Sequence, residues 1–227
     1  MRKYIVDIVA VLAMILFSGP SVAAGEPECS ELNAYVDGTV WEIVETIDKD
    51  KDVYHALKYY LDGTEIIEGK EYLKMYSERS IKKLSNNHIL KSEAYPTYIG
   101  GIRNIGGKIF FAPQKLFEEY LVFDYSIQPD QEVVIYPYLC SANPIPISEC
   151  IKCLGIDELM IGDKVIKLIK VMNGRDTHWF GLCQWKGGIG TSRGPLSPIY
   201  AEDSRGLTPY LRMVKINGKI VYQCSVE

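Results

Sequence analysis

The chain has 227 residues, of which 47% are hydrophobic and 24% are charged. This length is enough for one domain with a sizeable core, or for two small domains. The formal net charge is −4, and the lysines and arginines are scattered along the sequence. An acidic chain without a basic cluster argues against nucleic acid and anionic membrane surfaces as partners, because both require a positively charged face.

The N-terminus has the three parts of a secretory signal peptide. Arg2 and Lys3 form a short basic region, residues 8–17 form an unbroken apolar run, and small residues at 22–24 provide a cleavage site before Gly25. A transmembrane helix needs about 20 apolar residues, and this run is about half as long. We therefore predict a signal peptide at 1–24, a mature part at 25–227 without a transmembrane span, and export to the periplasm or the extracellular space.

A lipid-modified cysteine is an alternative interpretation of the same region, because Cys29 follows the apolar run closely. A lipid-modified cysteine normally follows small and apolar residues, whereas Glu26, Pro27 and Glu28 precede this one. Cleavage near Gly25 is therefore the preferred interpretation. No later segment is apolar enough to predict a helix that spans a bilayer.

After the signal peptide, short apolar and aromatic runs alternate with turn residues about every ten positions, which is typical of a sandwich or barrel. We predict an all-β fold, mainly an antiparallel meander that closes into a sandwich or partial barrel, with little helix. It is expected to be a single β domain, and the segment 141–146 is where two halves would join. The expected strands are 41–44, 55–61, 65–67, 72–76, 95–102, 108–111, 120–127, 133–138, 158–161, 165–171, 211–216 and 220–223.

Local sequence adds detail to this pattern. Asp62-Gly63 and Asn217-Gly218 each predict a tight hairpin turn, and the second demands the positive φ of a type I′ turn. Residues 51–61 allow a helix, because apolar residues recur there at helical spacing, but their β-branched and aromatic content favours a strand. Residues 77–92 and 139–149 are expected to be loops.

The cysteines leave three interpretations open. An even number of cysteines in an exported chain favours disulfides, although the sequence does not choose among the pairings. Cys150-x-x-Cys153 does not open a helix of a β-α-β unit, which argues against a thioredoxin-like redox site. A zinc site that recruits His178 and Cys183 is an alternative, and unpaired thiols are the third. The six cysteines are Cys29, Cys140, Cys150, Cys153, Cys183 and Cys224.

Residues Gly190 to Gly194 match the G-x-S-x-G pattern of a nucleophilic serine at Ser192. That mechanism requires a helix after the serine and a histidine further along the chain. Pro195 and Pro198 prevent a helix, and no histidine follows Ser192. The same glycines resemble a phosphate-binding loop only loosely, because neither a helix N-terminus nor a Walker lysine follows them. We therefore assign no catalytic residue, cofactor or metal.

Carboxylate pairs provide the main enzymatic alternative. Two carboxylates on either side of a glycosidic bond can hydrolyse it, and Glu118, Glu119 and Asp124 are candidates. Adjacent residues of a strand point to opposite faces, however, so Glu118 and Glu119 do not converge. A solvated, charged strand face is the simpler interpretation.

The connection from Trp179 to Tyr200 is the candidate binding segment. It combines Trp179 and Trp185 with Arg193 and several glycines and prolines, which disfavour regular strands. Binding groups often lie on such loops when a rigid scaffold holds them. We therefore predict that Trp179, Trp185, Arg193 and Tyr200 contribute to binding. The alternative is that Trp185 closes one end of the core while the glycines permit a tight return.

Two blocks of short motifs stand out in the second half of the chain. The first block contains Y-I-G-G-I-R-N from Tyr98, G-K-I-F from Gly107 and E-Y-L-V-F-D-Y from Glu119; the second contains W-K-G-G-I-G-T from Trp185 and G-P-L from Gly194. Together with Trp41 and the closing segment 217–222, they resemble exported proteins of gut-type Gram-negative bacteria. The resemblance implies a β fold and export, and it implies no activity, cofactor or catalytic set. Asn104 and Gly187 stand where those proteins have acidic residues, so no acidic role carries over to either position.

These observations favour an exported, non-catalytic binding module or envelope-associated protein. Its expected partner is a glycan, a peptide or another envelope protein. The alternatives are a carboxylate-dependent glycan hydrolase and a structural partner in an envelope assembly.

Overall fold

The computed structural model describes residues 30–93, 95–114, 116, 118–137, 148–161, 164–173, 182–199 and 209–224. Within these ranges the backbone forms fourteen β-strands and no helix, arranged in two sheets that are almost entirely antiparallel. The predicted all-β class is therefore confirmed, and so is the sandwich or partial barrel. Residues 51–61 belong to a strand, as their composition favours. The predicted junction at 141–146 lies outside the described residues.

The larger sheet has nine strands in the order β14-β13-β2-β3-β4-β6-β7-β8, with β5 pairing with the far end of β4. Every pairing within it is antiparallel, so consecutive strands mostly follow one another as a meander. Its strands are β2 (Thr39–Asp48), β3 (Val53–Ile67), β4 (Lys70–Lys83), β5 (Ile89–Ser92), β6 (Thr97–Ile105), β7 (Lys108–Pro113), β8 (Tyr120–Asp124), β13 (Tyr210–Ile216) and β14 (Lys219–Gln223).

The smaller sheet has five strands. Its strands are β1 (Ser30–Glu31), β9 (Glu132–Ile135), β10 (Glu149–Ile161), β11 (Lys164–Asn173) and β12 (Leu182–Lys186). β11 pairs with β10 on one side, and with β1 and β12 along different parts of its other side. Within the described residues, the pairing of β1 with β11 is the single parallel one. The two sheets meet where the amide of Tyr136 donates to the carbonyl of Leu121, at 2.8 Å.

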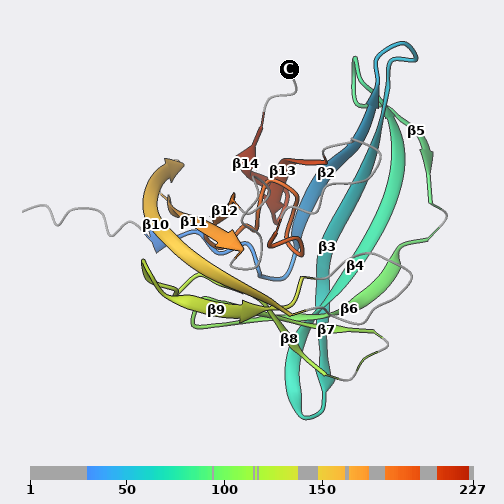
Figure 1. The fold of residues 1–227 in the computed structure, drawn as a ribbon. Helices are drawn as coiled ribbons and strands as arrows, with labels where there is room; N and C mark the ends of the chain where they lie inside the picture. The colour runs from blue at the N-terminus through green and yellow to red at the C-terminus, as the bar shows by residue number, and fades with distance from the viewer. Residues whose placement is uncertain are drawn as a thin grey trace, which may run out of the picture.

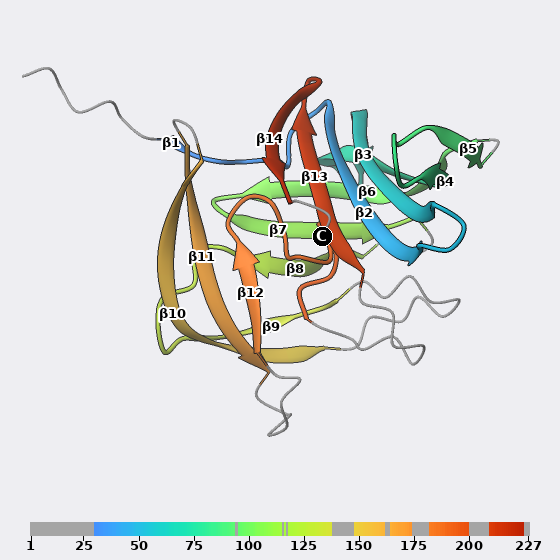
Figure 2. The ribbon, with the colours of Figure 1, turned by 90° about the horizontal axis from the view of Figure 1, so that it is seen from above.

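Both sheets curl around a common interior. In Figure 1 the long strands β2, β3 and β4 form a curved wall on one side, and β10 and β11 curl on the other. Seen from above in Figure 2, β6, β7 and β8 run crosswise between these two walls. Trp41, Phe111, Phe123 and Ile169 are buried between the walls and belong to one continuous core. The arrangement follows from strand alternation, which gives each sheet one apolar face to cover.

Three hairpins have turns with positive φ at both central residues, as type I′ turns require. Asn217 and Gly218 have φ values of 49° and 77°, which confirms the predicted turn between β13 and β14. Glu68-Gly69 and Gly106-Gly107 turn in the same way. The hairpin predicted at Asp62-Gly63 is wrong. Those two residues oppose Lys74 in a β-bulge, because β3 pairs with β4 on both sides of them.

The loop predicted at 77–92 is also wrong. β4 continues to Lys83 and β5 occupies 89–92, so most of this segment is strand. Its side chains are largely polar or charged because this part of the sheet has exposed faces, and the apolar alternation that signals a strand is weak there. The loop predicted at 139–149 lies mostly outside the described residues, although Glu149 begins β10.

The glycine loop, residues 187–194, runs through the interior instead of over the surface. Ile189 and Thr191 are fully buried within it. Its backbone meets the segment before β2, where the amide of Ala34 donates to the carbonyl of Gly188 at 2.7 Å. The indole N–H of Trp41 donates to the carbonyl of Ile189 at 2.9 Å. A Cβ at Gly188 would lie 1.9 Å from the carbonyl oxygen of Leu32, so this close approach requires glycine.

The disulfides expected from the sequence are not present among the described cysteines, which are thiols at 150, 153, 183 and 224. Strand geometry accounts for two of the possible pairs. Cys150 and Cys153 lie three residues apart on β10, so their side chains point to opposite faces. Cys153 and Cys183 both oppose Val171 from strands on either side of it. Two strand spacings separate their Cα atoms by about 10 Å, which is beyond the reach of a disulfide. Cys29 and Cys140 lie outside the described residues.

We predict that Gly188→Ala will destabilise the protein far more than Gly69→Ala. The two glycines have nearly equal φ values, +72° and +76°, but nothing lies within 4 Å of a Cβ at Gly69. The Gly69 variant should lose about 1 kcal/mol from backbone strain alone. The Gly188 variant should lose about 2–3 kcal/mol more from the clash with Leu32. Urea denaturation measures both, and equal losses would contradict this role of the glycine loop.

Candidate functional site

The structure describes two of the four residues that the sequence singled out for binding, Trp185 and Arg193. Trp185 is fully buried, and its indole N–H donates to the carbonyl of Pro198 at 2.7 Å. Its ring contacts Phe123 edge-on, with ring centroids 5.4 Å apart. Arg193, eight residues further along the chain, is half-buried. Trp179 and Tyr200 lie outside the described residues. In this arrangement Trp185 closes the core, as the alternative interpretation of the segment expected.

The catalytic patterns do not assemble into a catalytic group. Around Ser192, the backbones of Thr191 and Gly194 exchange two hydrogen bonds of 3.1 Å, and the described residues that follow form no helix. Glu118 accepts a hydrogen bond from Tyr120, whereas Asp124 is buried and pairs with Lys108. The described residues hold no cluster of three or more histidine, cysteine or acidic side chains that suits a metal ion.

An open concavity of about 580 Å³ is the candidate site. It lies where β3, β4 and β6 approach the segment that precedes β2, and the turn between β6 and β7 closes one end. This volume is within the usual range of small-molecule sites. The residues that line it are Asn33, Tyr35, Thr64, Glu71, Tyr72, Leu73, Ile102, Arg103, Asn104, Gly106 and Gly107.

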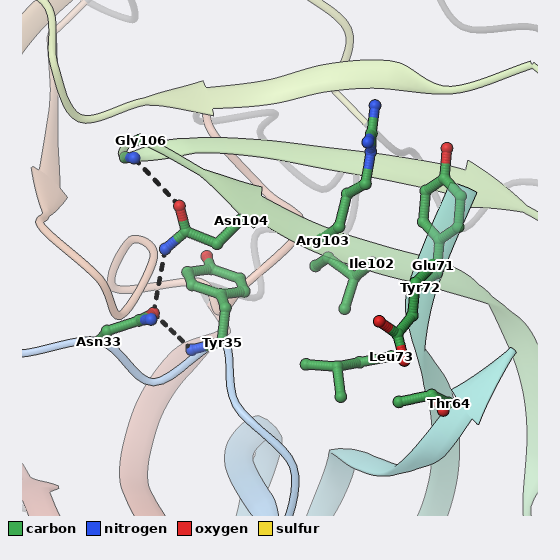
Figure 3. A pocket seen from close by; sticks show the side chains of 11 residues that line it. Asn33, Tyr35, Thr64, Glu71, Tyr72, Leu73, Ile102, Arg103, Asn104 and Gly106 are labelled. Carbon is green, nitrogen blue, oxygen red and sulfur yellow. Dashed lines mark hydrogen bonds between the residues drawn. The ribbon is translucent and has the colours of Figure 1, made fainter. Parts of the chain in front are cut away.

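One wall is a chain of amide groups. Figure 3 shows Asn33, Tyr35 and Asn104 gathered on this side. The side-chain oxygen of Asn33 accepts hydrogen bonds from the amide of Tyr35 at 3.0 Å and from the side chain of Asn104 at 3.1 Å. Asn104 in turn accepts from the amide of Gly107 at 3.0 Å. These bonds fix both side chains, and the Nδ2 donor of Asn33 has no acceptor among the described residues.

The opposite wall combines a carboxylate with an apolar floor. Thr64, Leu73 and Ile102 lie side by side on the inner face of β3, β4 and β6, because each is the direct cross-strand partner of the next. Glu71 is exposed at the rim, and no described residue donates to its carboxylate. Burial raises the pKa of Tyr35, whose hydroxyl lies 3.2 Å from that of Tyr125, so its ring adds an uncharged surface to the site.

Behind the concavity, the outer face of the sheet carries the Glu119 cluster, formed by Glu119, Arg103, Tyr72 and Lys70. Nε and Nη2 of Arg103 donate to the two oxygens of Glu119 at 2.7 and 2.6 Å, which is a bidentate pair. Tyr72 and Lys70 donate to the same carboxylate at 2.7 and 2.6 Å. Figure 3 shows Arg103 and Tyr72 pointing away from the side on which Thr64 and Leu73 lie.

The electrostatics of this cluster favour a fixed charge. Burial tends to raise the pKa of Glu119, but hydrogen bonds from Lys70, Tyr72 and Arg103 outweigh it and lower that pKa. Burial, with the nearby Glu119 carboxylate, raises the pKa of Tyr72 to about 12. Glu119 is therefore ionised and Tyr72 is neutral at pH 7. The cluster ties β4 and β6, two of the strands that form the floor of the concavity, to the segment before β8.

No family model matches this chain, and no curated protein or solved structure is significantly similar to it. The function must therefore be argued from the site itself. The part of the chain that the structure describes also contains no helix long and apolar enough to cross a membrane.

The concavity offers a small set of unlike groups: an amide donor, a carboxylate acceptor, a hydroxyl and an apolar floor. Among the described residues that line it, Glu71 is the one carboxylate, and none is a cysteine, serine or histidine. The lining therefore lacks the pair of carboxylates that hydrolyses glycosides. It is suited to recognising an uncharged ligand that is rich in hydroxyl groups and has one less polar face.

We predict that Glu119→Gln will destabilise the protein by about 2–3 kcal/mol at pH 7, because it removes charge-assisted hydrogen bonds from Arg103 and Lys70. A carboxyl whose pKa is lowered on folding stabilises above its unfolded pKa, about 4.3, and this contribution is lost as the pH falls through the folded value. The deficit of the variant should therefore shrink at about pH 3. Urea denaturation at both pH values measures it.

Glu118→Gln is the matched control, because the neighbouring carboxylate bonds only to Tyr120 among the described residues. It should change stability by less than about 0.5 kcal/mol at either pH. Equal effects of the two substitutions would contradict the assigned role of the Glu119 cluster.

Proposed function

We propose that this chain is an exported, non-catalytic binding module that recognises a saccharide in the concavity between Asn33 and Glu71. The observation that carries the proposal is the pairing of a fixed amide donor with an available carboxylate across an apolar floor. Sugar rings present hydroxyl groups at their edges and less polar C–H groups on their faces. The edges would bond to Asn33 and Glu71, and a face would lie on Leu73 and Ile102.

Binding is favoured over hydrolysis by the positions of the carboxylates. Glu119 is held by three donors on the opposite side of the sheet, and Asp124 is buried against Lys108. Glu71 therefore has no second carboxylate among the lining residues. Export is supported by the signal-peptide pattern in residues 1–24. Envelope and dietary polysaccharides are the saccharides that an exported protein would meet.

The proposal predicts that Asn33→Asp and Glu71→Gln each weaken saccharide binding at least tenfold. The first substitution keeps the oxygen that bonds to Tyr35 and Asn104 but removes the Nδ2 donor; the second removes the carboxylate charge. A hydrogen bond that involves a charged group contributes about 1.5–3 kcal/mol, and about 1.4 kcal/mol corresponds to a factor of ten. A polysaccharide microarray identifies the ligand, and calorimetry with its oligosaccharide measures the affinity.

Glu68→Gln is the matched control, because this glutamate is exposed at the β3–β4 turn and does not line the concavity. It should bind as tightly as the wild type, and all three variants should unfold at the same temperature as the wild type within about 2 °C. The proposal would be refuted if the folded protein bound no saccharide, or if all variants bound it equally tightly.

A further inference from the structure

A second cavity lies on the outer face of the larger sheet, away from the concavity. Its volume is about 220 Å³, enough for several water molecules. Val44, Ile47 and Leu84 provide apolar walls, and the Tyr210 side chain also lines it. Val44 belongs to a small satellite core that is separate from the main core of the protein. The cavity therefore has its own apolar environment.

One end of this cavity is cationic. Arg212 lines it, and Nη1 of Arg212 donates to Glu42 at 2.8 Å and also to the hydroxyl of Tyr54. Lys82 donates to the other oxygen of Glu42. Glu42, Lys82 and Arg212 all lie largely out of solvent, with side-chain exposures of 8%, 15% and 16%. The cationic side chains of Lys82 and Arg212 thus share the carboxylate of Glu42 in a site that is largely shielded from solvent.

The protonation states leave a net positive charge. Burial tends to raise the pKa of Glu42, but Lys82 and Arg212 outweigh it and lower that pKa, so Glu42 carries one negative charge. Burial and the charge of Glu42 raise the pKa of Tyr54 to about 12, so Tyr54 stays neutral. With Lys82 and Arg212 both charged, the cluster has one positive charge in excess.

The guanidinium of Arg212 has donors to spare. It carries five N–H groups in a planar fork, and both of its hydrogen bonds to described residues come from Nη1. Among the described residues, nothing accepts from Nε or Nη2. These two nitrogens form the edge of the fork that matches the two oxygens of a carboxylate. The hydroxyl of Tyr210 is also buried without a hydrogen-bond partner among the described residues.

We propose that this cavity binds a small monocarboxylate with an apolar tail, such as a short-chain or medium-chain alkanoate. The carboxylate pairs with Nε and Nη2 of Arg212, and the tail lies along Val44, Ile47 and Leu84. A single negative charge balances the excess positive charge of the cluster, whereas a phosphate dianion would exceed it. The apolar walls favour an alkyl chain, which would cover them, over a sulfate or phosphate, which would leave the walls exposed to water. This site is independent of the proposed saccharide site.

The test uses sodium hexanoate as the probe and hexan-1-ol and inorganic phosphate as comparison ligands, with calorimetry on the exported, folded protein. Hexanoate should bind at least tenfold more tightly than either comparison ligand. Equal binding of hexanol would overturn the role of Arg212. Equal binding of phosphate would overturn the role of the apolar walls, and no binding of hexanoate would overturn the site.

Two variants locate the probe. Leu84→Trp fills the cavity and leaves the residues of the charged cluster unsubstituted. Arg212→Lys keeps the charge but removes the fork. Each should weaken hexanoate binding at least tenfold. Leu90→Trp is the matched control, because Leu90 is exposed on β5, outside the cavity. If Arg212→Lys fails to fold, Leu84→Trp alone decides: unchanged hexanoate binding in that variant overturns the proposal.

Discussion

The rest of the structure depends on the close approach of two backbones inside the curled sheets. The glycine loop, residues 187–194, meets the segment before β2, and the contact is sealed by the 2.7 Å hydrogen bond from Ala34 to Gly188. Only glycine permits it, because a Cβ at Gly188 would lie 1.9 Å from the carbonyl of Leu32. A buried hydrogen bond of this kind contributes about 1 kcal/mol net, but an unpaired buried amide costs about 1–3 kcal/mol. Separating these two segments without exposing them to water would therefore cost more free energy than the hydrogen bond alone contributes.

The same contact positions the candidate site. Asn33 and Tyr35 flank Ala34, so fixing Ala34 on the glycine loop also fixes one wall of the concavity. The other wall belongs to β3, β4 and β6, and the Glu119 cluster holds these strands from the outer face. The two faces of the larger sheet thus carry different kinds of groups. The inner face presents polar groups on an apolar floor, and the outer face carries fixed charges, some of which border the second cavity.

Much of the fold could be predicted from local sequence, because alternating apolar residues and paired positive-φ turn residues determine strands and hairpins directly. Asn217-Gly218 illustrates this. Asp62-Gly63 shows the limit, because the same dipeptide also fits a β-bulge, and only the pairing of β3 with β4 on both sides decides between them. The candidate site was beyond local reasoning. Asn33 and Glu71 are far apart in the sequence and line opposite walls of one concavity, one of which the glycine loop holds in place through Ala34. Trp185, which the sequence offered as a binding residue, is fully buried. The weak signal was Asn104, which precedes a Gly-Gly turn and bonds to its amide.

Native-state hydrogen exchange at the amide of Ala34 tests the central claim most directly. Ala34 lies outside the strands, and a residue of this kind usually exchanges through local opening. If the contact with Gly188 holds the fold together, the Ala34 amide should exchange only through global unfolding, with the same opening free energy and denaturant dependence as Ile43 in β2 and Ile169 in β11. Exchange of Ala34 through a local, denaturant-independent opening, while those two amides remain protected, would contradict the account.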